Sequence, residues 1–295
     1  MPTISRVVAG YDGSPGSVAA VGLAAAEADA AGAVLRIVHA QLARSAYAYL
    51  APPGAVGDAA VEARRLVDTV REALLRAHPG LVVRTVVTTV SPGAALIRAA
   101  RSADLLVIGR GGHAAFGPAD HHRPPSGAIA AHVLAYAGCP VVIVGADAAT
   151  ASEPDGSRPV VLSFDPRTTP AAAVQHAFSA AERRGTGLRV CYVRRPDGQP
   201  WPDDAEARRV LSEALAPWRA AFADVPVAVE VLTGLDPAAQ LLDASTGAAL
   251  VVVAEAPAAG RPSRLPDVLI HNAACPVAVV PAQAARAALR PIPVG

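Results

Sequence analysis

Two glycine-containing segments, each following an apolar run, carry residue types that bind phosphate and ribose. Tyr11-Asp12-Gly13-Ser14-Pro15 follows a run that ends at Gly10, and Gly109-Arg110-Gly111-Gly112-His113 follows one that ends at Ile108. Glycine lets a backbone approach a ligand closely, and free N–H groups at a helix start bind anions. Arg110 adds a guanidinium that can hold a phosphate with two hydrogen bonds. Asp12 can accept hydrogen bonds from a ribose or, through water, hold a divalent cation.

A simpler interpretation fits the same residues. Glycines can just as well form a plain surface loop, and Asp12 can cap the helix that follows it. Short glycine motifs also occur by chance. The two segments therefore leave both interpretations open.

The surrounding sequence predicts alternating strands and helices. The strand candidates are short, β-branched and apolar throughout, which is typical of strands buried on both faces of a parallel sheet. Ser14-Pro15 and Ser91-Pro92 each place a hydroxyl before a proline, as at a helix start. We expect strands at Arg6–Gly10, Val34–Ala40, Leu81–Thr88, Leu105–Gly109 and Val141–Val144, and helices at Ser14–Ala31, Asp58–Ala77, Pro92–Ala103 and Ser126–Ala137.

The second half of the chain repeats the first. Val7–Asp12 resembles Val160–Asp165, and Gly138-Cys139-Pro140-Val141 resembles Ala274-Cys275-Pro276-Val277. The matches keep their order, which indicates a duplicated domain with shorter connections in the second copy. Strands are expected there near Val160–Phe164, Leu188–Val193, Val227–Leu232, Leu250–Ala254 and Val277–Val280. We predict domains at 1–147 and 158–282, a linker at 148–157 and a tail at 283–295.

This pattern predicts an α/β fold with two Rossmann-like, doubly wound domains. Each would have a five-stranded, mostly parallel sheet in the order 3-2-1-4-5. In such a sheet, ligands bind beyond the carboxyl ends of the strands where the strand order reverses, here between strands 1 and 4. The segments after Gly10 and Ile108 flank that crevice.

Composition excludes several classes of function. The 295 residues carry a net charge of +1, which gives no electrostatic reason to expect nucleic acid or an acidic membrane as partner. All 26 basic residues are arginines, so mechanisms that need a lysine amine are excluded. The three cysteines form no Cys-x-x-Cys motif or disulfide framework. Without a signal pattern or a membrane-length apolar run, the sequence predicts a soluble cytoplasmic protein.

Val7-Val8-Ala9-Gly10-Tyr11-Asp12-Gly13-Ser14 resembles the opening of universal stress proteins of the UspA type. Val107-Ile108-Gly109-Arg110-Gly111-Gly112, followed by Gly127-Ala128-Ile129 and Ala137–Val144, is similar to the closing half of these proteins. The resemblance covers both copies and implies a tandem universal stress protein. By position it implies that Gly10 and Asp12 meet an adenosine, that Ala40 contacts the adenine, and that the phosphates lie against Gly109, Gly112, Gly127, Ala128 and Ile129. Arg110 and His113, in the same glycine segment, are further candidate ligand-binding residues.

The sequence departs from the ATP signature of that family at two places. The signature is Gly, two residues, Gly, nine residues, then Gly followed by Ser or Thr. Here fourteen residues separate Gly112 from Gly127, and Ala128 replaces the hydroxyl residue. A hydrogen bond to a charged phosphate contributes about 1.5–3 kcal/mol. Backbone N–H groups remain available for the same purpose.

The extra residues lie in a loop that contains His113, Asp120, His121, His122 and Arg123. These residue types can bind metal or phosphate. However, adjacent histidines lack the spacing of metal ligands on a helix, and no cysteine is near. A solvated loop is the preferred interpretation, and no metal site is predicted.

The second copy has lost the features of the site. Asp165 persists, but Pro166 and Arg167 replace Gly13 and Ser14. Ala254-Glu255-Ala256-Pro257 replaces Gly109-Arg110-Gly111-Gly112, so a carboxylate and a proline stand where phosphate needs positive charge and N–H groups. We expect no nucleotide in this copy.

The leading hypothesis is therefore an adenine-nucleotide-binding sensor or regulator of the stress response, with its ligand in the first domain only. The cofactor would be ATP or another adenine nucleotide, with or without Mg²⁺. The alternative is an interaction scaffold of the same family that binds no nucleotide. No catalytic set is found, so no enzyme is predicted, although slow ATP hydrolysis with Asp12 holding Mg²⁺ is a third hypothesis. The resemblance also implies edge pairing through the fifth strands, hence a pseudo-dimer within the chain, and further a homodimer.

Overall fold

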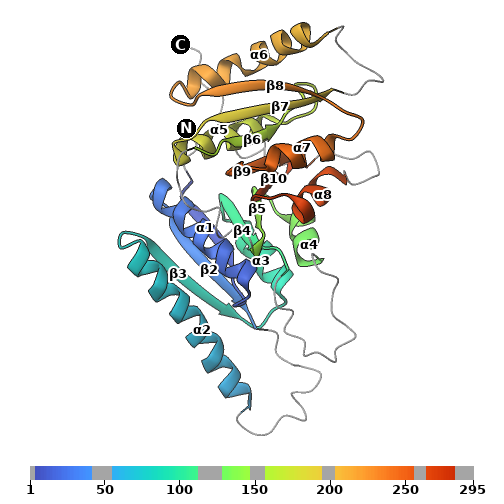
Figure 1. Ribbon diagram of the computed structural model, residues 1–295. Helices are drawn as coiled ribbons and strands as arrows, with labels where there is room; N and C mark the ends of the chain where they lie inside the picture. The colour runs from blue at the N-terminus through green and yellow to red at the C-terminus, as the bar shows by residue number, and fades with distance from the viewer. Residues whose placement is uncertain are drawn as a thin grey trace. The chain divides into compact units, whose positions relative to one another are not determined.

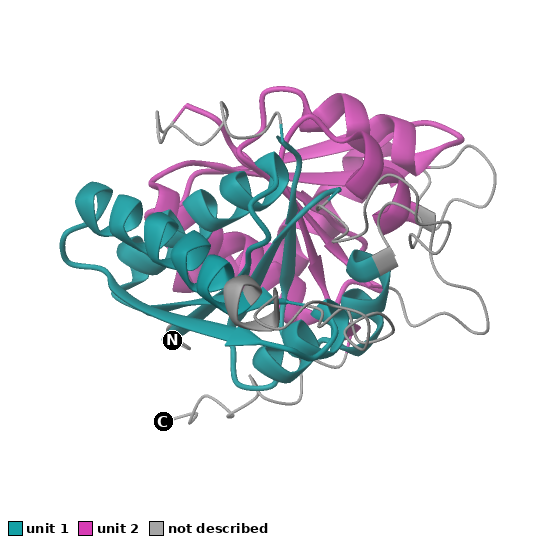
Figure 2. Ribbon diagram, turned by 90° about the horizontal axis from the view of Figure 1, so that it is seen from below, with its two compact units in different colours: residues 1–150 teal, residues 151–295 magenta. Residues whose placement is uncertain are grey.

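The computed structural model describes residues 4–41, 55–111, 128–146, 157–194, 203–255 and 264–282. The chain divides into two compact units, residues 1–150 and 151–295 (Figure 2). The predicted tail and nearly all of the predicted linker lie outside the described ranges. Each unit is an α/β sandwich, which confirms the predicted fold class.

Unit 1 alternates strands and helices from its first strand to its last (Figure 1). Its strands pair in the order β3-β2-β1-β4-β5, and all four pairings are parallel. The elements are β1 (Arg6–Gly10), α1 (Pro15–Ala31), β2 (Val34–Ala40), α2 (Ala55–Ala77), β3 (Val82–Thr88), α3 (Pro92–Ala100), β4 (Leu105–Gly109), α4 (Ala128–Tyr136) and β5 (Val141–Val144).

Right-handed crossovers determine which helices cover which face of this sheet. The chain moves one way along the sheet through α1 and α2 and returns through α3 and α4, so the two pairs cover opposite faces. The contacts agree, since α1 packs on β1 and β4 while α3 packs on α4, β2 and β1. Covered on both sides, the central strands form the core; Val7, Val8 and Ala9 of β1 are fully buried.

Helix α1 begins where Ser14 and Pro15 predict it. The Ser14 hydroxyl accepts a hydrogen bond from the Ser17 N–H at 3.2 Å, and the helix ends at Gly32, whose φ of +61° favours glycine. Most of its buried residues are small, five of the ten being alanine, so the helix lies close to the sheet. The expectation for α3 was half right: the helix begins at Pro92, but the Ser91 hydroxyl makes no capping hydrogen bond.

Unit 2 repeats this order as β8-β7-β6-β9-β10, again with parallel pairings throughout. By the same reasoning, α5 and α6 cover one face of its sheet, while α7 and α8, which pack on each other, cover the opposite face. Its elements are β6 (Val160–Ser163), α5 (Ala171–Arg184), β7 (Leu188–Arg194), α6 (Asp204–Ala221), β8 (Val227–Thr233), α7 (Pro237–Ser245), β9 (Leu250–Ala254), α8 (Arg264–Asn272) and β10 (Val277–Val280).

Candidate functional site

The turn between β1 and α1 holds Asp12 in a fixed position. Oδ1 of Asp12 accepts hydrogen bonds from the Ser14 N–H at 3.0 Å and the Ser14 hydroxyl at 2.6 Å. Gly13, which lies between them in the sequence, has a φ of +81°, a conformation that residues other than glycine rarely adopt. Asp12 thus organises its own turn, but the residue that caps α1 is Ser14 and not Asp12, contrary to the simpler interpretation. Its Oδ2 accepts no hydrogen bond within the described residues.

The start of α1 touches the end of β4. A Cβ on Gly109 would lie 2.4 Å from the carbonyl carbon of Gly16 and 2.6 Å from the Ser17 nitrogen. On the Asp12 side, Ser17 Oγ accepts a hydrogen bond from the Asp12 N–H at 3.3 Å. Ser17 therefore contacts both of the segments that the sequence singled out, and it brings Asp12 and Gly109 to the same edge of the sheet.

Arg110 extends the ladder between β4 and β5. Its N–H donates to the Val144 carbonyl at 2.7 Å. Its guanidinium lies over Gly145, where a Cβ would be 2.8 Å from Nη2. The positive charge thus sits at the carboxyl end of β5. Gly145 is not among the residues predicted for the site, although a glycine directly after a buried strand is a signal of close approach.

The end of β2 is tied to the loop that carries Asp12. The Tyr11 N–H donates to the Val38 carbonyl at 2.9 Å. Nδ1 of His39 lies 2.8 Å from the Tyr11 carbonyl oxygen, and because a carbonyl only accepts, Nδ1 is the donor. Burial and the nearby Asp12 charge raise the pKa of Tyr11, so its phenol stays protonated. These contacts fix Ala40, which is half-buried, next to the β1–α1 turn.

In unit 2, an arginine binds the carboxylate of the corresponding aspartate. The Arg167 guanidinium binds the Asp165 carboxylate through both oxygens, with N–O distances of 3.1 and 2.9 Å. Seven residues separate β6 from α5, against four between β1 and α1. The helix start is therefore farther along the chain from the strand end, and Pro170 at its N-cap supplies no capping side chain.

The charge at the end of the fourth strand is reversed between the units. Glu255 donates its N–H to the Val280 carbonyl at 2.9 Å, the same ladder position that Arg110 holds against Val144. Burial raises the pKa of Glu255. A half-buried carboxyl group thus stands in unit 2 where unit 1 has a guanidinium.

This duplicated arrangement has a counterpart among known families. The sequence pattern of the universal stress protein family matches residues 3–145 and again residues 156–281. The chain belongs to the universal stress protein family. It is a tandem member, with one family domain in each unit.

Relatives of similar length match this chain over most of its residues. A universal stress protein of Mycolicibacterium smegmatis is 33% identical over 261 residues, which cover 84% of this chain and 85% of that protein. One from Mycobacterium tuberculosis is 30% identical over 264 residues, with the same coverage. The crystal structure of a universal stress protein from Archaeoglobus fulgidus covers 94% of this chain and 98% of its own, with a TM-score of 0.67. At 16% identity, that likeness shows the fold.

The structure of this universal stress protein describes only some of the predicted site residues. It places Gly10, Asp12, Ala40, Gly109 and Arg110 at the carboxyl ends of β1, β2 and β4. Ala128 begins α4, and Ile129 on its first turn is 37% exposed. Gly112, His113, Gly127 and the histidine-rich loop lie outside the described residues.

Two further observations concern metals and membranes. Across the described residues, no three His, Cys, Asp or Glu side chains gather closely enough to hold a metal ion. No helix in the same ranges has both the length and the apolar character needed to cross a bilayer.

Proposed function

We propose that unit 1 of this universal stress protein binds an adenine nucleotide at the carboxyl end of its sheet, and that unit 2 binds none. The observation that carries the proposal is the junction at Ser17, which brings Asp12 and Gly109 together where the strand order reverses. In unit 2 the Asp165 N–H donates in the same way to Thr169 Oγ1 at 2.9 Å, but Arg167 occupies both oxygens of the Asp165 carboxylate, which leaves no free acceptor there for a ribose. The protein would then act as a nucleotide-dependent sensor or regulator in the stress response.

Each residue of unit 1 has a definite part in this proposal. Oδ2 of Asp12 accepts a hydrogen bond from a ribose hydroxyl while Oδ1 stays bound to Ser14. The half-buried Ala40 offers a small apolar surface to the base. Arg110 supplies positive charge near the phosphates, and Gly111, with a φ of +73°, turns the backbone after it.

A bound divalent cation would neutralise phosphate charge. The residue suited to hold it through water is Asp12, because carboxylate oxygens and water are the ligands that Mg²⁺ prefers. The role of Asp12 does not require the metal, since its hydrogen bond to ribose is independent of phosphate charge.

Calorimetric titration of the full chain with ATP, with and without Mg²⁺, tests the proposal. We expect one site per chain, and the same titration with ADP, AMP and cyclic AMP shows which phosphate pattern is preferred. If millimolar nucleotide produces neither a binding heat nor a rise in melting temperature, nucleotide binding is contradicted. Two sites per chain contradict the restriction to unit 1.

The competing function is an interaction scaffold of the same family that binds no nucleotide. It is favoured by Ala128, which lacks the hydroxyl of the family signature, and by the use of Asp12 Oδ1 within its own turn. Absorbance of the denatured protein separates the two functions, since only a nucleotide-binding protein releases an adenine chromophore after purification. In both functions, a cytoplasmic location, the absence of enzymatic activity, the pseudo-dimer and the homodimer stay predictions.

A further inference from the structure

Two arginines lie side by side on one face of the unit 1 sheet. Arg36 of β2 is the register partner of Arg84 of β3. Paired residues share a face, and this is the α3 face, because Gly10, in register with Val38 two residues beyond Arg36, packs against Leu96 of α3. In the part of the chain that the structure describes, neither arginine forms an ion pair or a side-chain hydrogen bond. Like charges directly opposite each other destabilise a sheet, so the pair calls for an explanation.

Strand β3 is also an open edge. Among the described strands it pairs only with β2. The Gln41 N–H donates to the Thr88 carbonyl, so Thr88 and every second residue before it direct their backbone groups toward β2. The backbone groups of Val83, Thr85 and Val87 therefore point outward, and no described residue forms a hydrogen bond with them.

The equivalent edge of unit 2 is covered. The outward carbonyls of Val227 and Val229 on β8 accept hydrogen bonds from Arg219 at 3.5 Å and from Arg208 at 3.1 Å, both on α6. Within the described residues of α2, no arginine forms such a hydrogen bond with β3. The inner strand differs too: Arg189, the counterpart of Arg36, is in register with Ala228 and donates to the Ala244 carbonyl at the end of α7. The open edge and the unpaired arginines thus occur together in unit 1.

Protection against aggregation does not account for this surface. A charged residue on an edge strand does discourage edge-to-edge pairing, and Arg84 by itself fits that role. Arg36, however, lies on an inner strand, where no edge needs protection. On the same face as Arg84, Val82 is 53% exposed, which leaves apolar surface next to the two charges.

We propose that the β3 edge of unit 1 is a docking site for an extended acidic segment of a partner protein. The segment would add to the sheet about 4.8 Å from β3 and take up the outward N–H and C=O groups. On the α3 face, a glutamate would lie opposite Arg84, with Arg36 one strand farther, and apolar side chains would lie opposite Val82 and Val86. The charge complementarity selects an acidic segment rather than a basic one.

Blocked peptides added to the full chain test the proposal. The probe is Thr-Val-Thr-Glu-Thr-Val-Thr with a fluorophore, and its matched control has lysine in place of glutamate. We expect the glutamate peptide to bind, the lysine peptide to bind at least five-fold more weakly, and the difference to shrink in 0.5 M salt. Residue-resolved hydrogen exchange should show protection of the Val83, Thr85 and Val87 amides, with those of Arg84 and Val86 unchanged.

Variants identify the charge responsible. Arg84→Gln should weaken glutamate-peptide binding about five-fold, and Arg84→Glu should transfer the preference to the lysine peptide. Arg71→Gln, on the exposed side of α2, makes the same charge change on the opposite face of the sheet and should have no effect. Equal binding of both peptides, no binding at millimolar peptide, protection elsewhere, or pairing of β3 with a second copy of the chain would each overturn the proposal. So would an Arg84→Gln variant that aggregates while its peptide binding is unchanged.

Discussion

Gly16 and Gly109 meet backbone to backbone. A Cβ on Gly109 would lie 2.4 Å from the carbonyl carbon of Gly16, and a Cβ on Gly16 would lie 2.7 Å from the Arg110 carbonyl oxygen. The first turn of α1 can lie on the end of β4 only because neither residue has a side chain. This contact holds the two halves of the candidate nucleotide site together.

Gly109→Ala should therefore destabilise unit 1. The added methyl group meets only backbone, which cannot turn aside, so we expect a loss of about 3 kcal/mol. Gly22→Ala is the matched control, since nothing lies within 4 Å of that position on α1; it should stabilise by about 0.5–1 kcal/mol. Urea unfolding followed by circular dichroism measures both. Equal stability of the two variants would show that the helix and strand ends separate easily.

Asp12→Asn should weaken nucleotide binding about ten-fold, because a charged acceptor is replaced by a neutral one. The amide oxygen can still accept the hydrogen bonds from Ser14, so the turn should persist. Asp165→Asn makes the same change in unit 2 and should leave affinity unaltered. Calorimetry with ATP compares them, and an effect of the unit 2 variant as large as that of the unit 1 variant would reassign the site.

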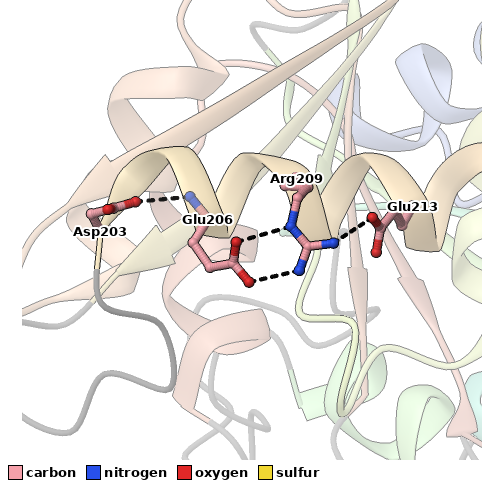
Figure 3. Close-up of polar contacts among 4 residues, drawn as sticks. All are labelled: Asp203, Glu206, Arg209 and Glu213. Atoms are coloured by element: carbon pink, nitrogen blue, oxygen red, sulfur yellow. Dashed lines mark hydrogen bonds and ion pairs between the residues drawn. The ribbon is translucent and has the colours of Figure 1, made fainter.

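Asp203→Ala should cost about 1 kcal/mol by removing the cap of α6. The Asp203 carboxylate accepts a hydrogen bond from the Glu206 N–H at 2.8 Å, and Asp203→Ser should retain most of the stability of the helix (Figure 3).

Arg209, on the same helix, binds Glu206 and Glu213 at the surface (Figure 3). Solvent and side-chain entropy cancel most of the value of such pairs, so Arg209→Gln should leave the melting temperature nearly unchanged. A larger loss for Arg209→Gln would mean that the surface network, and not the cap, holds the helix start.

The three cysteines should not react with a thiol reagent in the folded protein. Burial raises the pKa of Cys139, Cys191 and Cys275 to about 12, so almost no thiolate exists at pH 8. In the unfolded chain these thiols ionise near pH 8.5, so stability should fall as the pH rises from there toward 12. Counting reactive thiols at pH 8 before and after denaturation checks this, with none and then three expected. Fast reaction in the folded state would mean that a segment carrying one of these cysteines opens readily.

Glu255→Gln should stabilise unit 2 at pH 7. Burial raises the pKa of Glu255, so the folded state favours the neutral carboxyl group. The preference for the neutral carboxyl group stabilises the folded state fully at pH values below the pKa of Glu255 in the unfolded chain. This stabilisation is lost as the pH rises through the pKa of Glu255 in the folded protein. The gain from the glutamine should therefore disappear at pH 3.5. Melting curves at both pH values measure it, with Glu62→Gln on the exposed side of α2 as control; a gain that is the same at both pH values would exclude the titration as its cause.

Local sequence patterns determined most of the secondary structure. The β-branched runs predicted β1, β2, β4 and β5 with the bounds that the structure has, because strands covered on both faces are mostly apolar, even though β2 also carries Arg36 and His39. Ser14-Pro15 predicted the start of α1, since the cap and the proline act within one turn. The duplication was visible from repeated motifs, and the alternation of strands and helices predicted the strand order within each unit.

Tertiary structure decided which distant groups meet. The sequence singled out Gly109 for phosphate, but only the fold shows its contact with Gly16, which is far away along the chain. It likewise places the Arg110 guanidinium over Gly145, ties His39 to the Tyr11 carbonyl, and sets Arg36 beside Arg84. Alternation along a strand predicts which face of the sheet a side chain lies on. Which residues that side chain contacts is determined by strand register and helix packing, and these depend on the whole core.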